Sequence, residues 1–481
     1  MNRIKNKSSV KNDLLKSLRE GKSLSFRQQL LLIIKLSIPA IMAQLSSILM
    51  EYIDASMVGS LGANGSAAIG LVASSTWLLA GLCSAVSTGF TVLVAQSIGA
   101  KDEPQARKIV KIGLIFAICF SIILLSGGTA ISTVLPKWLG GSKDICPDAS
   151  KYLIVYALSL PAVQMTNISG GMIQASGNMK LPSMLHIVMC FLDIIYNMFL
   201  IFPAREVSFG IFEFTMPGAG LGVMGAAIGT ALAQLTVACI MLIYLLIKSP
   251  MLKLRKGERF TFDGNILGKA VRIAIPVGIE QIVMCGAQIV STRIVSPLGN
   301  VAIAANSLSV TAESLCYMPC YGIGAAATTL IGQSVGAGRR DITKRLGWIT
   351  TGFGMVVMAV GGGLMYILAP VMIGVLSPDP QIRELGTLIL RIEAFAEPMY
   401  AASIVASGVF HGAGDAAVPS IFSFVSMWAV RLPLAALLAG SMGLQGVWIA
   451  MAIELCVRGI LFIVRLSGRK WLHTLSTEKE S

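Results

Sequence analysis

Residues 95–100 read A-Q-S-I-G-A, and residues 332–337 read G-Q-S-V-G-A, 237 positions later. The same shift aligns further prolines, glycines and amides over about 145 residues without a gap, as expected of a duplicated unit. The aligned pairs include Pro39 with Pro276, Gln44 with Gln281, Pro161 with Pro398, Gly171 with Gly408 and Gly177 with Gly414. The chain therefore consists of two similar halves.

Both halves are strongly apolar. Of the 481 residues, 55% are hydrophobic and only 13% are charged, and the mean hydropathy is +0.76. A soluble chain of this length needs a charged surface that this composition does not supply. Apolar runs of about 20 residues recur instead, which is the length that crosses a bilayer as a helix. No alternation typical of a β-barrel is present, so we expect an all-α polytopic membrane protein.

The apolar runs predict twelve membrane-spanning helices, six in each half. We expect a basic tail over 1–28, an N-lobe over 29–248, a linker over 249–267, a C-lobe over 268–467 and a second tail over 468–481. The predicted spans are 29–53, 66–97, 108–135, 150–176, 182–203, 221–248, 268–296, 302–333, 346–376, 386–410, 418–441 and 445–467. With twelve spans, both termini lie on the same side.

The basic residues indicate which side that is. Of the 38 Lys and Arg residues, 28 fall in segments on the side of the N-terminus and 5 in the opposite loops. Loops rich in Lys and Arg stay in the cytoplasm, so we expect both termini there and the protein in the cell membrane. This distribution explains the formal charge of +14 without nucleic acid, which would require a contiguous basic face on a soluble module.

An even number of spans in each half gives the two halves the same orientation in the membrane. They should then form two pseudo-symmetric six-helix lobes, related by a two-fold axis along the membrane normal, around a central cavity. Transporters use this arrangement for alternating access, whereas a channel or an enzyme has no general need for it. The three histidines have no suitable partner nearby, and we do not expect an enzyme.

Several charged residues of the apolar runs have no counterpart in the other half. Glu51 and Asp54 lie three residues apart, so they share a face of the first predicted helix. Asp193 and Asn197 share a face of the fifth. A carboxylate within a span is costly unless protein shelters or neutralises it. We predict that these four residues bind a coupling cation, H⁺ or Na⁺, with hydration of the two first-helix acids and a structural hydrogen bond at Asp193 as alternatives.

Further polar residues, most of them in the second half, point to the central cavity. Glu280 follows Pro276 by one turn, where a bent helix should expose its backbone, and Glu313 lies in the next predicted helix. We place Glu280 and Glu313 at this cavity, together with the repeated amides Gln44 and Gln281. For Glu393 and Glu397 an ion pair with Arg391 or Arg431 is the better interpretation, and Arg293 and the pair Glu454–Arg458 should form internal ion pairs as well.

Two loops at equivalent places have the composition of hinges. Gly177 and Gly414 should end the fourth and tenth helices, and Asn178 and Asp415 can cap the helices that follow. We therefore expect cytoplasmic hinges at these four residues.

With these residues in place, the sequence resembles the multidrug and toxic compound extrusion family of secondary transporters. The resemblance rests on I-D-A-S-M-V-G-S-L-G at 53–62, on I-P followed five residues later by Gln in spans one and seven, and on the two hexapeptides quoted above. It covers about residues 30–467. It implies a V-shaped pair of lobes that alternates between inward- and outward-open states, with Asp54 as the acid that binds the coupling cation. The fifth span departs from one branch of the family, because Asp193 and Asn197 stand in reversed order.

The resemblance implies export of organic, mostly cationic, drugs in exchange for H⁺ or Na⁺, with Na⁺ as the one metal ion expected, at Asp54 and Asp193. An alternative is a flippase or exporter of a lipid-linked or other endogenous metabolite, which would favour basic residues in the cavity. We expect no cofactor apart from the transported cation. The expected partners are small organic substrates and the lipid bilayer, and the protein should work as a monomer.

Overall fold

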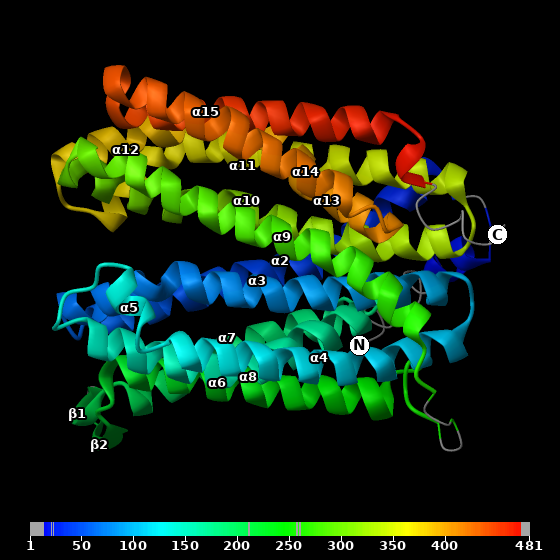
Figure 1. The fold of residues 1–481 in the computed structure, drawn as a ribbon, viewed down its shortest axis with the longest axis horizontal. Helices are drawn as coiled ribbons and strands as arrows, with labels where there is room; N and C mark the ends of the chain where they lie inside the picture. The colour runs from blue at the N-terminus through cyan, green and yellow to red at the C-terminus, as the bar shows by residue number, and fades with distance from the viewer. Residues whose placement is uncertain are drawn as a thin grey trace.

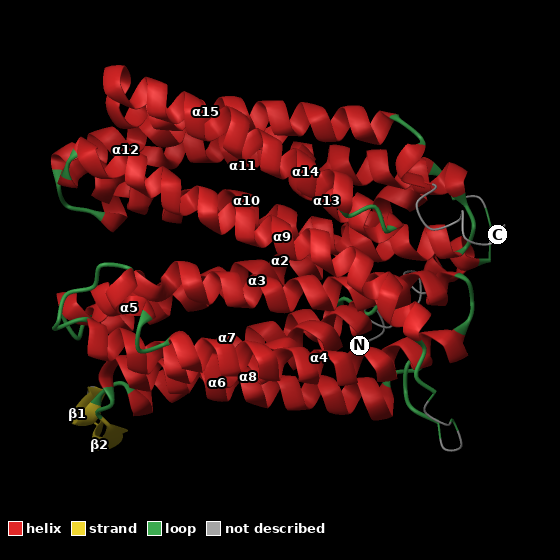
Figure 2. Cartoon of the chain, in the orientation of Figure 1, coloured by secondary structure: helices red, strands yellow, loops and turns green. Residues whose placement is uncertain are grey.

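The computed structural model describes residues 14–472 apart from residues 21, 23, 210, 211, 256, 257, 259 and 260. Helices form nearly all of it (Figure 2). They gather into two lobes that lie one above the other in Figure 1. The first and last described residues, Leu14 and Leu472, belong to one apolar cluster, and the end of the molecule that holds it is here called the terminal end. The opposite end carries the hairpin of β1 and β2 and is called the hairpin end. The first half of the chain forms one lobe and the second half forms the other.

The N-lobe contains six long helices, as the apolar runs predict. A short helix, α5 (Leu135–Trp138), precedes the fourth of them, and a π-helical turn, η1 (Tyr244–Lys248), ends the sixth. The long helices are α2 (Phe26–Gly59), α3 (Ala63–Gly99), α4 (Glu103–Ile131), α6 (Cys146–Ala175), α7 (Lys180–Leu200) and α8 (Gly222–Ile243).

The C-lobe repeats this order with two irregular spans. Its first three helices are α9 (Gly264–Val295), α10 (Asn300–Gly336) and α11 (Arg340–Leu376), with a 3-10 turn, η2 (Ser296–Leu298), between the first two. The tenth span consists of α12 (Pro380–Glu393) and α13 (Glu397–Ala413). The last two spans run through α14 (Ala417–Val425), the π-helical η3 (Ser426–Arg431) and α15 (Leu432–Ser467), followed by the 3-10 turn η4 (Lys470–Leu472).

The prediction of twelve spans is confirmed. Within the described residues, ten continuous helical segments are long and apolar enough to cross a membrane. Gly443 has φ 58° and ψ −140° inside α15, so a sharp break there divides the last segment into two spans. Residues 394–396 interrupt the tenth span between α12 and α13, which are too short to cross singly. Together these two features account for the two spans that a search for continuous helices does not separate.

The long loop of the first half is not irregular. Pro203–Phe209 (β1) pairs antiparallel with Phe212–Ala219 (β2) at the hairpin end. The predicted spans 182–203 and 221–248 leave this segment as a connection, and the apolar pattern does not predict the hairpin.

The two lobes meet through helices that are equivalent in the repeat. The first helix of each lobe packs against the second helix of the other, α2 against α10 and α9 against α3. These contacts are close. A Cβ at Gly322 of α10 would collide with the backbone of Ala40 and Ile41 of α2, and one at Gly89 of α3 would collide with the Ala270 carbonyl of α9. The interface therefore follows the same two-fold relation as the sequence.

Candidate functional site

Three of the four residues predicted to bind the coupling cation meet in the N-lobe. Asp54 comes from α2, whereas Asp193 and Asn197 lie one turn apart on α7. The Asn197 side-chain amide donates hydrogen bonds to Asp54 Oδ1 at 2.8 Å and to Asp193 Oδ2 at 3.0 Å. One amide thus bridges two carboxyl groups.

This cluster is buried on the α7 side. The side chains of Asp193 and Asn197 are completely buried, and Asp54 is partly exposed. Asp193 Oδ1 and Asn197 Oδ1 are buried oxygens without a hydrogen-bond partner among the described residues. Two carboxylates this close repel each other when both are ionised, and burial increases the cost. A single proton or a small cation would relieve that repulsion, and the two free oxygens offer it acceptors.

Two residues that sequence reasoning missed complete the surroundings. Gly229 of α8 packs against Asn197, because a Cβ there would collide with Asn197 Oδ1. The phenol of Tyr152 on α6 lies within electrostatic range of both carboxyl groups. A glycine and a tyrosine in apolar helices carry no signal that distinguishes them from packing residues, so only the fold could reveal them.

Glu51 does not join the cluster. Its side chain is exposed, and it makes no hydrogen bond or ion pair with described residues. It lies within electrostatic range of Asp54 in its own lobe and of Tyr317 on α10 in the other. Glu51 therefore lies near the boundary between the lobes, beside the cluster rather than in it.

The predicted cavity residues are dispersed. Glu280 accepts hydrogen bonds from Ser423 Oγ at 2.7 Å and Ser420 Oγ at 3.2 Å, within the C-lobe. Gln281 instead reaches the N-lobe, because its Oε1 lies 2.8 Å from the position of a Cβ on Gly81. Gln44 is half-buried and makes no side-chain hydrogen bond with described residues, and Glu313 is 5% exposed.

The ion pairs expected in the C-lobe form only in part. Glu454 and Arg458 do pair, with Arg458 Nε 3.0 Å from Glu454 Oε1, although the angle is too poor for a hydrogen bond between these two atoms. Glu393 and Glu397 are completely buried, and none of their carboxyl oxygens has a hydrogen-bond partner among the described residues. The prediction that Arg391 or Arg431 forms an ion pair with them was wrong.

The two arginines are engaged elsewhere. Arg391 Nε donates to the Tyr366 carbonyl at 3.3 Å, and Arg431 Nη2 contacts Met451 Sδ at 2.8 Å. Arg431 still lies within electrostatic range of Glu393, at more than ion-pair distance. Arg293 is exposed and has no ion pair among the described residues, so that expectation was wrong as well.

The hinge glycines adopt the conformation that their sequence predicts. Gly177 has φ 91° and Gly414 has φ 86°, the left-handed conformation that ends a helix. Asn178 Oδ1 accepts a hydrogen bond from the Leu181 backbone at 3.4 Å and so caps α7. Asp415 instead forms an ion pair with Arg465 at 2.6 Å, because the last helix brings that guanidinium over the loop. The capping role expected for Asp415 was therefore wrong.

The duplicated hexapeptides form a latch between the lobes at the terminal end. Gln333 Nε2 donates to the Ala175 carbonyl at 2.6 Å, and Gln96 Nε2 donates to the Gly412 carbonyl at 3.1 Å. The two bonds are equivalent under the shift of 237, and each joins one lobe to the other. This pair of bonds is called the glutamine latch below.

Two glycines allow the latch to close. A Cβ at Gly336 would collide with the Gln96 carbonyl, and a Cβ at Gly99 would collide with the Gln333 carbonyl. The glycine at the fifth position of each hexapeptide is thus required by the backbone of the other. The described structure is closed at the terminal end.

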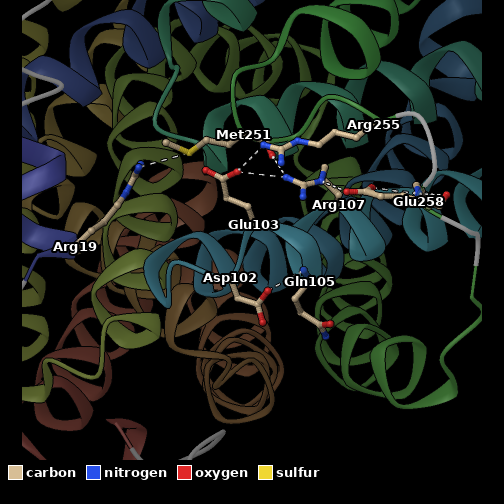
Figure 3. Close-up of polar contacts among 9 residues, drawn as sticks. Arg19, Asp102, Glu103, Gln105, Arg107, Met251, Arg255 and Glu258 are labelled. Atoms are coloured by element: carbon tan, nitrogen blue, oxygen red, sulfur yellow. Dashed lines mark hydrogen bonds and ion pairs between the residues drawn. The ribbon is translucent and has the colours of Figure 1, made fainter.

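Residues 14–19, which precede α2, contact the glutamine latch and both lobes, and this segment is called the brace below. Leu14, Leu15 and Leu18 are buried in an apolar cluster that joins both lobes. Arg19 donates to Gln333 Oε1 at 3.2 Å in the C-lobe and to the Ser176 carbonyl at 3.2 Å in the N-lobe. Figure 3 shows its further contact with Met251 Sδ, at 3.5 Å.

The chain between the lobes is tied to the N-lobe. Arg107 of α4 is 3% exposed and donates to Glu258 Oε1 at 2.7 Å and to Glu103 Oε2 at 3.3 Å (Figure 3). Lys108 forms an ion pair with Asp263 at 2.8 Å. The hydrogen bond from Arg107 lowers the pKa of Glu258, and the one from Lys108 lowers the pKa of Asp263. These contacts hold the described residues of the linker against α4 of the N-lobe.

Two lobes of six spans, a sheltered carboxyl pair and a closable end define a multi-pass membrane transporter. The MatE family model matches residues 39–199 and again residues 276–437, two stretches that begin 237 positions apart. These matches cover more than half of the chain, and the protein belongs to the MatE family.

Individual relatives agree with this assignment. The chain is 28% identical over 451 residues to a probable multidrug resistance protein NorM of Thermotoga maritima, covering 91% of this chain and 92% of that protein. It is 26% identical to the uncharacterized transporter YisQ of Bacillus subtilis, covering 87% and 90%. Among solved structures, one described as MATE in the straight conformation gives a TM-score of 0.85 at 19% identity, covering 95% and 98%. A Vibrio cholerae MATE transporter gives 0.82 at 18% identity, covering 95% and 97%.

Proposed function

We propose that the protein is a secondary active antiporter that exports organic, mostly cationic, compounds from the cell in exchange for H⁺ or Na⁺. The observation that supports this most directly is the pair of carboxyl groups of Asp54 and Asp193 bridged by Asn197. Relatives named as multidrug resistance proteins support the substrate class. We further propose that both termini face the cytoplasm, because the basic residues concentrate at that end of the molecule.

In this proposal the protein alternates between an outward-facing and an inward-facing conformation, and this alternation carries the cation inward and the drug outward. The glutamine latch closes the terminal end, so we assign the described state as the one that exchanges with the outside. A cation that enters from outside neutralises the repulsion between Asp54 and Asp193. The difference in its affinity for the two states then supplies the free energy that opens the latch. Drug enters from the cytoplasm in the second state and leaves when the latch closes again.

The test is efflux measured in everted membrane vesicles with a pH gradient and a Na⁺ gradient imposed separately. We expect Asp54→Asn to abolish gradient-driven efflux while the protein still reaches the membrane, because the amide cannot exchange a proton and binds Na⁺ more weakly. The matched control is Asp148→Asn, which removes an exposed carboxyl group from an ion pair with Lys151 at the hairpin end. Normal transport by the Asp54 variant would refute the role assigned to that residue, and the gradient that drives the wild type identifies the cation.

A further inference from the structure

A groove at the hairpin end of the C-lobe is outside the transport machinery described so far. It has a volume of about 370 Å³ and lies between α11 and α12. Its lining residues are Pro370, Arg383, Glu384, Thr387, Leu388 and Arg391. Arg391 lies within the predicted span 386–410, where an unpaired guanidinium is costly, and the exposed Arg383 lies just before that span.

The polar residues of the groove form one stripe. Arg383, Thr387 and Arg391 are spaced by four residues, so they share a face of α12. Eight residues of helix span about 12 Å, so Arg383 lies near the end of the span and Arg391 lies deeper.

Arg391 has one structural role that leaves most of its donors free. Proline has no backbone N–H, so Pro370 cannot bond the Tyr366 carbonyl four residues earlier in α11. Arg391 Nε supplies that bond at 3.3 Å, and its guanidinium lies 5.2 Å from the centre of the Tyr366 ring. A guanidinium has five N–H donors. The remaining donors of Arg391 have no acceptor among the described residues.

The guanidinium of Arg383 has even fewer polar partners than that of Arg391. Its side chain makes no hydrogen bond or ion pair with described residues, and its guanidinium packs against Gly374, 2.7 Å from the position of a Cβ there. Glu384 lines the same groove without pairing with either arginine. The formal charge of the groove is therefore +1, which suits a monoanion.

Apolar side chains that are close in sequence to the lining residues, on α11 and just after α12, are exposed. The exposed fractions are 69% for Ile367, 61% for Val371, 82% for Val375 and 76% for Phe395. On membrane helices, such residues contact acyl chains. A ligand of the groove is thus expected to combine an anionic group with hydrocarbon.

The N-lobe has no basic residues at the equivalent positions. Under the shift of 237, the counterparts of Arg383 and Arg391 in the N-lobe are Cys146 and Ile154. The same architecture therefore exists in the same molecule without the basic stripe.

We propose that this groove binds the phosphodiester of a membrane phospholipid. Arg383 and the free N–H groups of Arg391 donate to the phosphate oxygens, and the Thr387 hydroxyl donates a further bond. Charge-assisted bonds from arginine forks are the strongest that proteins offer to phosphate. The acyl chains lie along the exposed residues of α11 and beside Phe395, and Glu384 faces the rest of the headgroup.

The experiment is native mass spectrometry of the purified full-length protein, titrated with phosphatidylglycerol, with phosphatidylethanolamine and with inorganic phosphate. We expect saturable binding of phosphatidylglycerol that is at least about ten-fold weaker in the double variant Arg383→Gln/Arg391→Gln. The variant Arg391→Lys, which keeps the charge and a donor for the Tyr366 carbonyl, shows whether any loss comes from disturbed packing. The control Lys151→Gln removes a basic residue from the hairpin end of the N-lobe.

The outcomes separate the alternatives. Equal binding of lipid by the wild type and the double variant would refute the proposal, as would an equal loss in Lys151→Gln. Inorganic phosphate that displaces the lipid at similar concentration would show a simple anion site and overturn the assignment to a phospholipid. We also expect Glu384→Gln to increase the preference for phosphatidylglycerol over phosphatidylethanolamine, because the carboxylate repels an anionic headgroup and attracts an ammonium.

Discussion

Removal of one latch glutamine should open the terminal end measurably. The variant Gln333→Ala deletes the 2.6 Å bond to the buried Ala175 carbonyl and the 3.2 Å bond from Arg19. A buried carbonyl left without its donor costs about 1–3 kcal/mol, and Arg19 retains its bond to Ser176, so we expect a net loss of about 2 kcal/mol. A change of that size raises the population of the open state roughly 30-fold.

Hydrogen–deuterium exchange of the reconstituted protein measures this population, because amides at the interface exchange only when it opens. We expect exchange in residues 95–100 and 332–337 to become about 30-fold faster. Gln96→Ala should have a smaller effect, since its bond is longer and it has no contact with Arg19. The matched control is Gln164→Ala, which loses a buried bond to Ser87 within the N-lobe. Exchange that is unchanged in Gln333→Ala, or equally accelerated in Gln164→Ala, would refute the latch.

Three further predictions concern the same end of the molecule. Gly336→Val should accelerate exchange in both hexapeptides without removing a polar group, because its Cβ collides with the opposite backbone, whereas Gly352→Val, which points into open space, should not. Arg19→Gln should accelerate exchange at residues 14–20 and weaken the protection of Gln333. Unchanged rates would show that the brace does not stabilise the closed terminal end. The pKa of Glu258 is lowered in the folded state, so its contribution is present above the ordinary glutamate value and is lost as the pH falls through the folded value. The protection of the linker amides, measured relative to their intrinsic exchange rate at each pH, should therefore fall in acid in the wild type, but not further in Glu258→Gln.

The fold could be predicted from the sequence because its signals are long and redundant. Apolar runs define the spans, and the shift of 237 repeats the prolines and glycines that shape them. The exceptions are local. The break at Gly443 and the β1–β2 hairpin depend on short segments whose conformation is set by packing and strand pairing, which a hydropathy pattern does not record.

The site could be predicted only in part, for a physical reason. Asp54, Asp193 and Asn197 are polar groups in apolar runs, and the cost of burying each one marks it in the sequence. Their meeting could be inferred because an unpaired carboxyl group needs a partner. The partner of a given charge is less predictable. Arg391 serves a carbonyl freed by Pro370 rather than Glu393, since guanidinium donors satisfy backbone as readily as carboxylates.

Residues that recur in both halves and polar residues that occur in only one half lie in different parts of the fold. Duplicated glutamines and glycines form the latch at the terminal end, where the two lobes must fit each other symmetrically. The unduplicated Asp54 lies on α2, which packs against α10 of the other lobe. Tyr52 of α2 donates to the Thr311 carbonyl of α10 at 2.8 Å, and α10 continues without interruption to Gln333 in the latch. One helix contact therefore joins the cation site to the closed end. We expect a shift of α2 on cation binding to act on the latch through α10, so that an asymmetric site can control a symmetric closure.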